Sequence, residues 1–186
     1  HDSKRENAKV MALERVIDYR YEIEDENGKK SIKISGIADR IDELTENTIQ
    51  LIDYKSGATP HLEFAGIDSL FNGKYQQRIS NIFQTLLYSM ILSRKCPNMK
   101  VKPSLYYASR MLNDKYSPFI SIKEQRGVGE VIEDYRVVGE EYETKLTNIF
   151  KEMFNKDIPF RQAEDINTRN RCDYRKICKL LNEPSY

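Results

Sequence analysis

Two carboxylates and a lysine have the types and spacing needed for metal-assisted hydrolysis: Asp39, Asp53 and Lys55. Residues two apart in a β-strand share a face, so Asp53 and Lys55 should point to the same side of a strand and Tyr54 to the other. If the chain reverses at Glu46, antiparallel pairing puts Asp39 directly opposite Asp53. The Cβ atoms of such neighbours lie about 4.5–5.5 Å apart, so both carboxylates could hold one divalent cation.

This carboxylate pair predicts a site for a hard cation. Two carboxylates so close together repel each other unless a positive charge lies between them. Mg²⁺ prefers oxygen ligands and keeps water molecules that a substrate phosphate can replace. Lys55 could then orient a metal-bound water or stabilise charge on the phosphorus under attack. The same residues could instead form an exposed ion pair on a solvated sheet, and spacing alone does not decide between the two.

A second set of polar residues lies on an amphipathic helix that is expected from Lys74 to about Lys95, where apolar residues recur at helical spacing. Gln84 and Tyr88 are four residues apart and project together from one side of this helix. Uncharged hydrogen-bonding groups suit the flank of a phosphate site, because another carboxylate would repel the substrate. Such a pair is also common on exposed helices. The polar stripe consists of Gln77, Asn81, Gln84 and Tyr88.

Basic residues gather around this helix, although the chain as a whole is nearly neutral. With 30 Lys and Arg against 29 Asp and Glu, the net charge of +1 argues against a nonspecific polycation. No acidic residue occurs between Asp68 and Asp114, however, and clustered cations displace counterions from a nucleic-acid backbone. A solvated basic helix would show the same pattern. Tyr75, Tyr106 or Tyr107 could stack on bases. The residues expected to bind nucleic acid are Lys74, Arg78, Arg94, Lys95, Lys100 and Lys102.

The whole chain, residues 1–186, is expected to form one α/β domain, because internal repeats, low-complexity tracts and Pro/Gly linkers are absent. Asn27-Gly28 is a strong hairpin signal and residues 45–47 indicate another reversal, so three consecutive strands should form an antiparallel meander. A helix and a further strand after it indicate a mixed central sheet flanked by helices. The expected strands are 16–24, 31–43, 48–55 and 104–109, the last of which could pair with residues around 118–122. The expected helices are 74–95, 140–154 and 172–181.

Composition narrows the class of protein further. No run of about 18 apolar residues occurs, so no membrane span is expected. The first residues, HDSKRENAKV, contain neither an initiator Met nor a signal pattern, so we expect a piece of a longer protein. Three cysteines, Cys96, Cys172 and Cys178, are too few and too unevenly placed for a disulfide framework, which favours a reducing cytoplasm.

The run SGIADRIDELTENTIQLIDYKSG, followed downstream by QTLLYSM, resembles the nuclease domain of RecB and AddB type in the PD-(D/E)xK superfamily. In that family, Gly-x-x-Asp, Asp-x-Lys and Gln-x-x-x-Tyr motifs build one metal-dependent phosphodiesterase site on a restriction-endonuclease-like core. The resemblance implies an Mg²⁺- or Mn²⁺-dependent DNA exonuclease domain, part of an ATP-dependent helicase-nuclease of recombinational DNA repair. No GxxxxGK[ST] phosphate loop is present, so ATP would be hydrolysed by a separate helicase domain or subunit.

The resemblance also assigns a role to each matching residue. The metal ligands would be the Asp39 and Asp53 carboxylates and the carbonyl of Tyr54. Lys55 would be the catalytic lysine, supported by a Gln and a Tyr of the helix. The catalytic set is therefore Asp39, Asp53, Lys55, Gln84 and Tyr88.

Two features depart from the family pattern. A His usually precedes the first Asp motif, whereas the chain before Asp39 offers only His1. This leaves open an alternative function, a catalytically silent nuclease-like module that binds DNA or a partner subunit. AddB-type members also carry cysteines for a four-iron cluster, but Arg169 stands where one of them would be. Because a cubane cluster requires four thiolates, no iron-sulfur cluster is expected, and Cys172 and Cys178 should be buried apolar residues instead.

Overall fold

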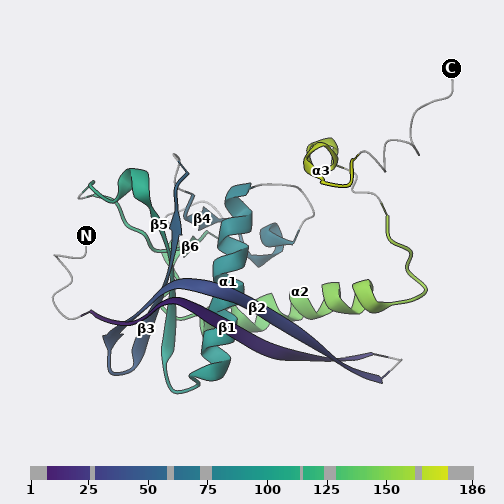
Figure 1. The fold of residues 1–186 in the computed structure, drawn as a ribbon, viewed down its shortest axis with the longest axis horizontal. Coiled ribbons are helices and arrows are strands. Elements are labelled where there is room, and N and C mark those ends of the chain that lie inside the picture. Colours follow the sequence, from purple (N-terminus) through teal and green to yellow (C-terminus); the bar gives the residue numbers. More distant parts are fainter. Residues whose placement is uncertain are drawn as a thin grey trace.

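The structure is a computed structural model that describes residues 8–25, 28–57, 61–71, 77–113, 115–123, 129–161 and 165–175, with the backbone alone at 77, 78, 167 and 171. Figure 1 shows a long, curved pair of strands crossed by one helix, with a second helix leading away towards the C-terminal end. The strands are β1 (Lys9–Asp25), β2 (Gly28–Thr45), β3 (Thr48–Lys55), β4 (Glu63–Phe64), β5 (Lys100–Tyr107), β6 (Ser121–Ile122) and β7 (Glu130–Val131). The helices are η2 (Ile67–Leu70), α1 (Gln77–Lys95), η3 (Ala108–Arg110), α2 (Arg136–Phe154) and α3 (Ile166–Arg171).

The central sheet has the strand order β1-β2-β3-β5. The first three strands are antiparallel, whereas β5 runs parallel to β3, with Thr48 opposite Lys100 and Lys55 opposite Tyr107. Parallel neighbours need a crossover connection, and α1 forms the main part of it (Figure 1). The predicted fold class, a mixed central sheet built on an antiparallel meander and flanked by helices, is confirmed.

Both predicted reversals occur. At the first, Gly28 pairs with Asp25 and has a φ of 100°, which a residue without a Cβ adopts readily. Residues 26–27 of this turn lie outside the described residues. The second reversal is a two-residue turn at 46–47. Local turn chemistry therefore sets the order of the first three strands.

From Arg40 to Glu43 the register between β2 and β3 is the predicted one, but the predicted pairing of Asp39 directly opposite Asp53 does not form, because the ladder ends at Arg40 and Ile52. Arg40 lies opposite Ile52 and Glu43 opposite Ile49, as a reversal at Glu46 requires. Strand β3 has neighbours on both sides and is buried over most of its length. Its predicted bounds, residues 48–55, agree with the structure.

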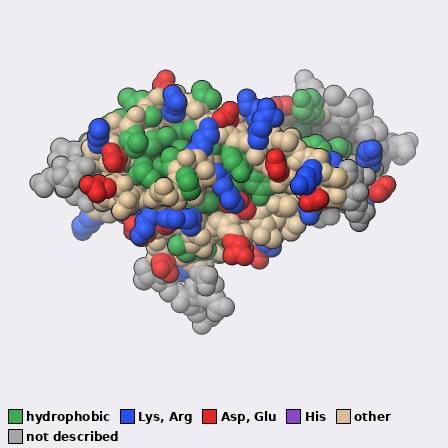
Figure 2. Space-filling view, turned by 90° about the horizontal axis from the view of Figure 1, so that it is seen from below, with side chains coloured by type: hydrophobic (Ala, Val, Ile, Leu, Met, Phe, Trp, Pro, Cys, Tyr) green, Lys and Arg blue, Asp and Glu red, His purple; other side chains and the backbone are tan. Residues whose placement is uncertain are grey.

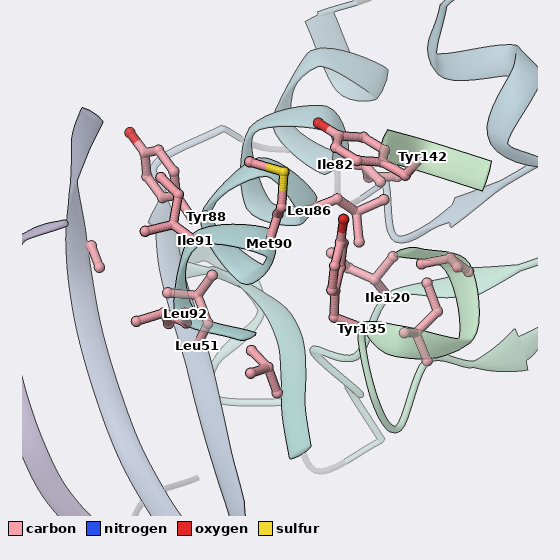
Figure 3. Packing of buried hydrophobic residues seen from close by; sticks show 14 of the residues in the cluster. Leu51, Ile82, Leu86, Tyr88, Met90, Ile91, Leu92, Ile120, Tyr135 and Tyr142 are labelled. Carbon is pink, nitrogen blue, oxygen red and sulfur yellow. The ribbon is translucent and has the colours of Figure 1, made fainter. Parts of the chain in front are cut away.

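Helix α1 packs across the sheet and carries much of the core. It contacts β5 most extensively and also β1 and β3. Figure 3 shows Tyr88 on the side of α1 that faces the long strands, and Tyr135 and Tyr142 on its other side. Tyr88 is only 9% exposed, and the described side chains of the polar stripe, those of Asn81, Gln84 and Tyr88, contact the sheet or each other. The fully buried residues of α1 include Ile82, Leu86, Met90 and Ile91.

Helix α2 begins at Arg136, one turn earlier than predicted. The hydroxyl of Tyr142 donates to the carbonyl of Phe83 in α1, 3.0 Å away. The hydroxyl of Tyr21 in β1 lies 2.8 Å from the hydroxyl of Thr147. These contacts connect α2 with both α1 and the edge strand of the sheet.

The predictions for the second half of the chain are confirmed in part. The strand predicted at 104–109 is β5, which ends at Tyr107. Ser104 forms an antiparallel bridge with Phe119, so the suggested pairing with the segment near 120 is present. Strand β6 of that segment belongs to a separate small sheet with the order β4-β6-β7.

Of the helix predicted at 172–181, residues 172–174 are not helical, Arg175 is helical, and residues 176–181 lie outside the described residues. A separate short helix that was not predicted, α3, precedes this segment and ends at Arg171. The side chain of Asp165 accepts from the N–H of Thr168 and caps the start of α3. No helix within the described ranges is long and apolar enough to cross a membrane.

Candidate active site

Strands β2 and β3 part next to the predicted carboxylates. Their ladder ends at the pair Arg40 and Ile52, after which β2 continues along β1 and β3 along β5. The backbone N–H of Tyr54 then donates to Oδ2 of Asp39, 2.8 Å away. Because the N–H and C=O of a strand residue point to the same neighbour, the Tyr54 carbonyl faces the side on which Asp39 lies. The end of the ladder thus brings oxygen atoms of two strands to one place.

Asp53 lies beside Lys55, as predicted for residues two apart in one strand. Asp53 is 4% exposed, and its Oδ2 lies 2.6 Å from Nζ of Lys55. The contact is a short, buried ion pair, and a carboxylate oxygen has further lone pairs that can bind another partner.

The electrostatic environment of Asp53 favours an added positive charge. Burial raises the pKa of the Asp53 carboxyl, and the neighbouring Asp39 raises it further. The ammonium of Lys55 acts in the opposite direction but leaves the pKa above its ordinary value. Ionisation of Asp53 is therefore less favourable in the protein than in water, and a cation between the two carboxylates would reduce that cost.

A chain of hydrogen bonds links Lys55 to the predicted polar stripe of α1. Nζ of Lys55 donates to Oε1 of Gln84 at 3.1 Å, and Nε2 of Gln84 donates to the hydroxyl of Tyr88 at 3.1 Å. Gln84 uses both ends of its amide in this chain, which defines its orientation. The structure therefore brings Gln84 and Tyr88 to Lys55, although they lie on a different element.

The fit between α1 and β2 depends on Gly36. A Cβ at this position would lie 2.3 Å from the hydroxyl oxygen of Tyr88 and 2.5 Å from two of its ring carbons. The phenol thus lies directly against the backbone of β2. In the sequence, Gly36 was only the first residue of the Gly-x-x-Asp motif. The close approach of α1 explains why this position needs a residue without a side chain.

One further residue of the stripe lies beside the site. Nδ2 of Asn81 donates to the hydroxyl of Tyr107 at 3.4 Å, and Tyr107 pairs with Lys55 in the parallel register of β3 and β5. The sequence placed Asn81 in the polar stripe but did not indicate that Tyr107 lies beside the site. The position of Tyr107 depends on the parallel pairing of β5 with β3, which the crossover creates.

The donor set suits Mg²⁺ or Mn²⁺. In the part of the chain that the structure describes, no group of three or more His, Cys, Asp or Glu residues could hold a metal, so Asp39 and Asp53 form a set of two carboxylates. Mg²⁺ is commonly bound by one or two carboxylates together with water and substrate phosphate. A structural Zn²⁺ would need four N or S ligands, which this site does not offer. Oδ2 of Asp53 is buried and contacts a positive charge, the ammonium of Lys55, which agrees with a site that favours cations.

The basic residues that were expected to bind nucleic acid are largely engaged within the protein. Arg94 forms an ion pair with Glu143, and Lys95 lies 2.7 Å from Asp18, whose pKa it lowers. On the face shown in Figure 2, basic and acidic side chains alternate. Binding of nucleic acid by these residues stays a prediction.

The other predicted basic positions differ among themselves. Lys102 lies 2.7 Å from Glu133 and 3.7 Å from the centre of the Phe119 ring, and its side chain is only 11% exposed. Lys100 is exposed at the start of β5. Lys74 and the side chain of Arg78 lie outside the described residues.

Three smaller expectations concern aromatic residues and cysteines. Tyr106 and Tyr107 are each 2% exposed, so the suggestion that they stack on bases is wrong: their rings belong to the packed interior. Tyr75 lies outside the described residues. Cys172, the residue that follows α3, is exposed, so its predicted burial is wrong as well. Cys178 is not described.

Comparison with known proteins agrees with this geometry. The profile of the PD-(D/E)XK nuclease superfamily matches residues 1–179, and the chain belongs to this superfamily, whose members are generally metal-dependent nucleases. The mixed sheet with flanking helices is consistent with a restriction-endonuclease-like fold. No curated protein sequence matches the chain.

Proposed function

We propose that this chain is a DNA exonuclease domain of RecB/AddB type that hydrolyses phosphodiester bonds with Mg²⁺ or Mn²⁺. The observation that supports this most strongly is the continuous set of contacts among the three motifs. Tyr54 donates to Asp39, Asp53 pairs with Lys55, and Gln84 links Lys55 to the helix. A site without function would not need to bring two carboxylates, a lysine and an amide together.

In this proposal Asp39 and Asp53, with the carbonyl of Tyr54, hold the cation. The bound cation would polarise the phosphate and lower the pKa of an attacking water. Asp39 is held in place by the N–H of Tyr54, so one ligand is oriented by the strand that carries the others. This arrangement needs little reorganisation when a cation binds.

Lys55 acts on the phosphate. Its ammonium can move from Asp53 Oδ2 to a phosphate oxygen and stabilise the negative charge that develops during attack. Gln84 accepts from Nζ of Lys55 and so limits where the ammonium can lie. Tyr88 accepts from Gln84 and orients the amide, which makes Gln84 and Tyr88 positioning residues.

The wider context of the proposal is a helicase-nuclease that acts in recombinational repair. It rests on the resemblance to the nuclease domains of RecB and AddB type, and in this context ATP would be hydrolysed by a separate domain or subunit. DNA would be delivered by a helicase domain or subunit. Of the basic residues predicted to guide the strand, Lys100 is exposed and forms no ion pair within the described part of the chain.

The test is cleavage of end-labelled single- and double-stranded DNA with Mg²⁺, Mn²⁺ or EDTA. Lys55→Ala should abolish cutting while circular dichroism shows an intact fold. Lys33→Ala is a matched control, because Lys33 lies on β2 with a side chain 63% exposed, and it should cut like wild type. Product lengths from differently labelled ends report the polarity.

Mn²⁺ binding by calorimetry separates the proposal from its alternative. Metal binding without cutting would favour a catalytically silent module that binds DNA or a partner subunit. A chain that neither binds Mn²⁺ nor cuts would overturn the assigned roles of Asp39 and Asp53.

A further inference from the structure

Strand β1 contains an unusual backbone conformation directly beside the candidate site. Glu14 has a φ of 45°, and among the described residues it is the one non-glycine residue with positive φ. It lies between the pairs Leu13–Arg40 and Arg15–Ala38, which places it opposite Asp39. A side chain with a Cβ adopts this left-handed conformation rarely, and it interrupts the extended geometry of a strand.

The face that β1 turns towards the core changes at Glu14. Beyond it, the odd-numbered residues Ile17, Tyr21 and Ile23 are buried. Before it, the even-numbered Ala12 packs against the core. In a regular strand all inward residues share one parity, so the interruption at Glu14 shifts the alternation by one residue.

Strand β2 changes in the same way at the position across from Glu14. Gly36 faces Tyr88 of α1, and Ala38 is buried. After this point Asp39 and Ile41 turn inward, since Asp39 reaches Tyr54 of β3 and Ile41 belongs to the core. Gly36 and Asp39 are three residues apart and would point to opposite faces of a regular strand.

We propose that Glu14 is a positioning residue whose left-handed backbone turns Asp39 towards Asp53. The β1–β2 ladder keeps one register from Ala12 through Glu14 to Asp25, and it shifts only between Val10 and Ala12, so β2 follows the bend of β1 at Glu14. The effect runs through the backbone, and the exposed carboxylate of Glu14 is not required. This inference rests on the proposed function, because it explains how a metal ligand reaches its place.

Substitutions that differ in tolerance for positive φ test it. Glu14→Gly and Glu14→Asn keep the left-handed conformation accessible, whereas Glu14→Val opposes it, because β-branched residues are outliers there. Glu22→Val is the matched control, since Glu22 is an exposed glutamate in a regular part of the same strand. If Glu14→Val does not fold, Glu14→Ala replaces it.

Two readouts are measured below the unfolding temperature of each variant. The first is hydrogen exchange of the Tyr54 amide by NMR, which reports its bond to Asp39 without any metal. The second is Mn²⁺ affinity by calorimetry. Glu14→Val should speed exchange and weaken Mn²⁺ binding by at least about tenfold each, the loss expected for one charge-assisted hydrogen bond. The exchange rate and the Mn²⁺ affinity should stay within about twofold of wild type in the other three variants, Glu14→Gly, Glu14→Asn and Glu22→Val.

Other results would overturn the inference. Unchanged exchange and affinity in a folded Glu14→Val would show that the bend does not place Asp39. Equal loss of Mn²⁺ binding in Glu14→Gly and Glu14→Val would show that the carboxylate itself acts. If wild type binds no Mn²⁺ but Tyr54 exchange responds as expected, the nuclease proposal fails and the positioning role of Glu14 stands.

Discussion

Replacing Gly36 with alanine should disturb the site through the packing of α1. The new Cβ would lie 2.5 Å from two ring carbons of Tyr88, whereas carbon atoms are in good contact at roughly 3.5 Å or more. The ring must therefore withdraw by about 1 Å. Tyr88 is 9% exposed and belongs to the core, so the ring cannot move without shifting its neighbours.

The magnitude follows from this geometry. Overpacking a well-packed core costs about 1–3 kcal/mol of unfolding free energy. At about 2–4 °C per kcal/mol for a protein of this size, Gly36→Ala should lower Tm by about 2–12 °C. The shift reaches Lys55 through Gln84, and a displacement near 1 Å typically costs about 100-fold in rate.

Thermal unfolding and initial cleavage rates at saturating Mn²⁺ measure the two effects. Gly57→Ala is the matched control, because the nearest atom to its Cβ would be a ring carbon of Tyr107 at an ordinary 3.8 Å. Adding Tyr88→Ala to Gly36→Ala should cost less stability than the two single changes together, by at least about 1 kcal/mol, since the second change removes the clash.

Two results would refute this reasoning. If Gly36→Ala unfolds and cleaves like wild type, the contact with Tyr88 does not set the position of α1. If Tm falls while the cleavage rate stays, the contact stabilises the fold but does not hold Gln84 against Lys55.

Four further predictions concern charge, metal binding and hydrogen bonding. The pKa of Asp53 is raised in the folded protein, so the contribution of this group to stability is largest at low pH and is lost as the pH rises through the folded-state pKa. Asp53→Asn in EDTA should therefore raise Tm at pH 7, and the gain should shrink on acidification. An unchanged or lower Tm at pH 7 would contradict this. Mg²⁺ at 100 times its Kd should stabilise wild type by about 2.7 kcal/mol and Asp53→Asn by none, as thermal shift would show. Tyr88→Phe leaves an N–H of Gln84 without its acceptor and should cost about 1 kcal/mol in urea unfolding as well as cleavage rate; full activity would remove Tyr88 from the relay to Lys55. Lys100→Glu should weaken DNA binding and reduce the slope of log K against log salt by about 0.7–0.9, and an unchanged slope in titrations at several salt concentrations would exclude this contact.

Much of the fold follows from local sequence signals. Gly28 and the reversal at 46–47 define the two turns, and a tight reversal fixes which residues of β2 and β3 lie opposite each other. This is why the facing of Asp53 and Lys55 could be predicted correctly. The motif residues themselves could be identified without any coordinates.

Other predictions failed where distant segments decide the outcome. Tyr106 and Tyr107 were suggested to stack on bases, yet β5 lies inside the fold and both rings are buried. Arg94 and Lys95 were predicted to bind nucleic acid, and this stays a prediction, but the sequence did not show that Glu143 and Asp18 of other elements pair with them. No local pattern shows such partners, since each pair is far apart in the chain.

The sequence by itself determined the meander, the register of β2 against β3 and the identity of the candidate site residues, because turns and alternation act over a few residues. Only the tertiary structure decided that β2 and β3 part beside Asp39, that Gly36 admits the ring of Tyr88, and that the backbone of β1 has a positive φ at Glu14, opposite Asp39. These features depend on how α1 packs across the sheet. That packing is set by the shape of the whole core, which no short stretch of residues encodes.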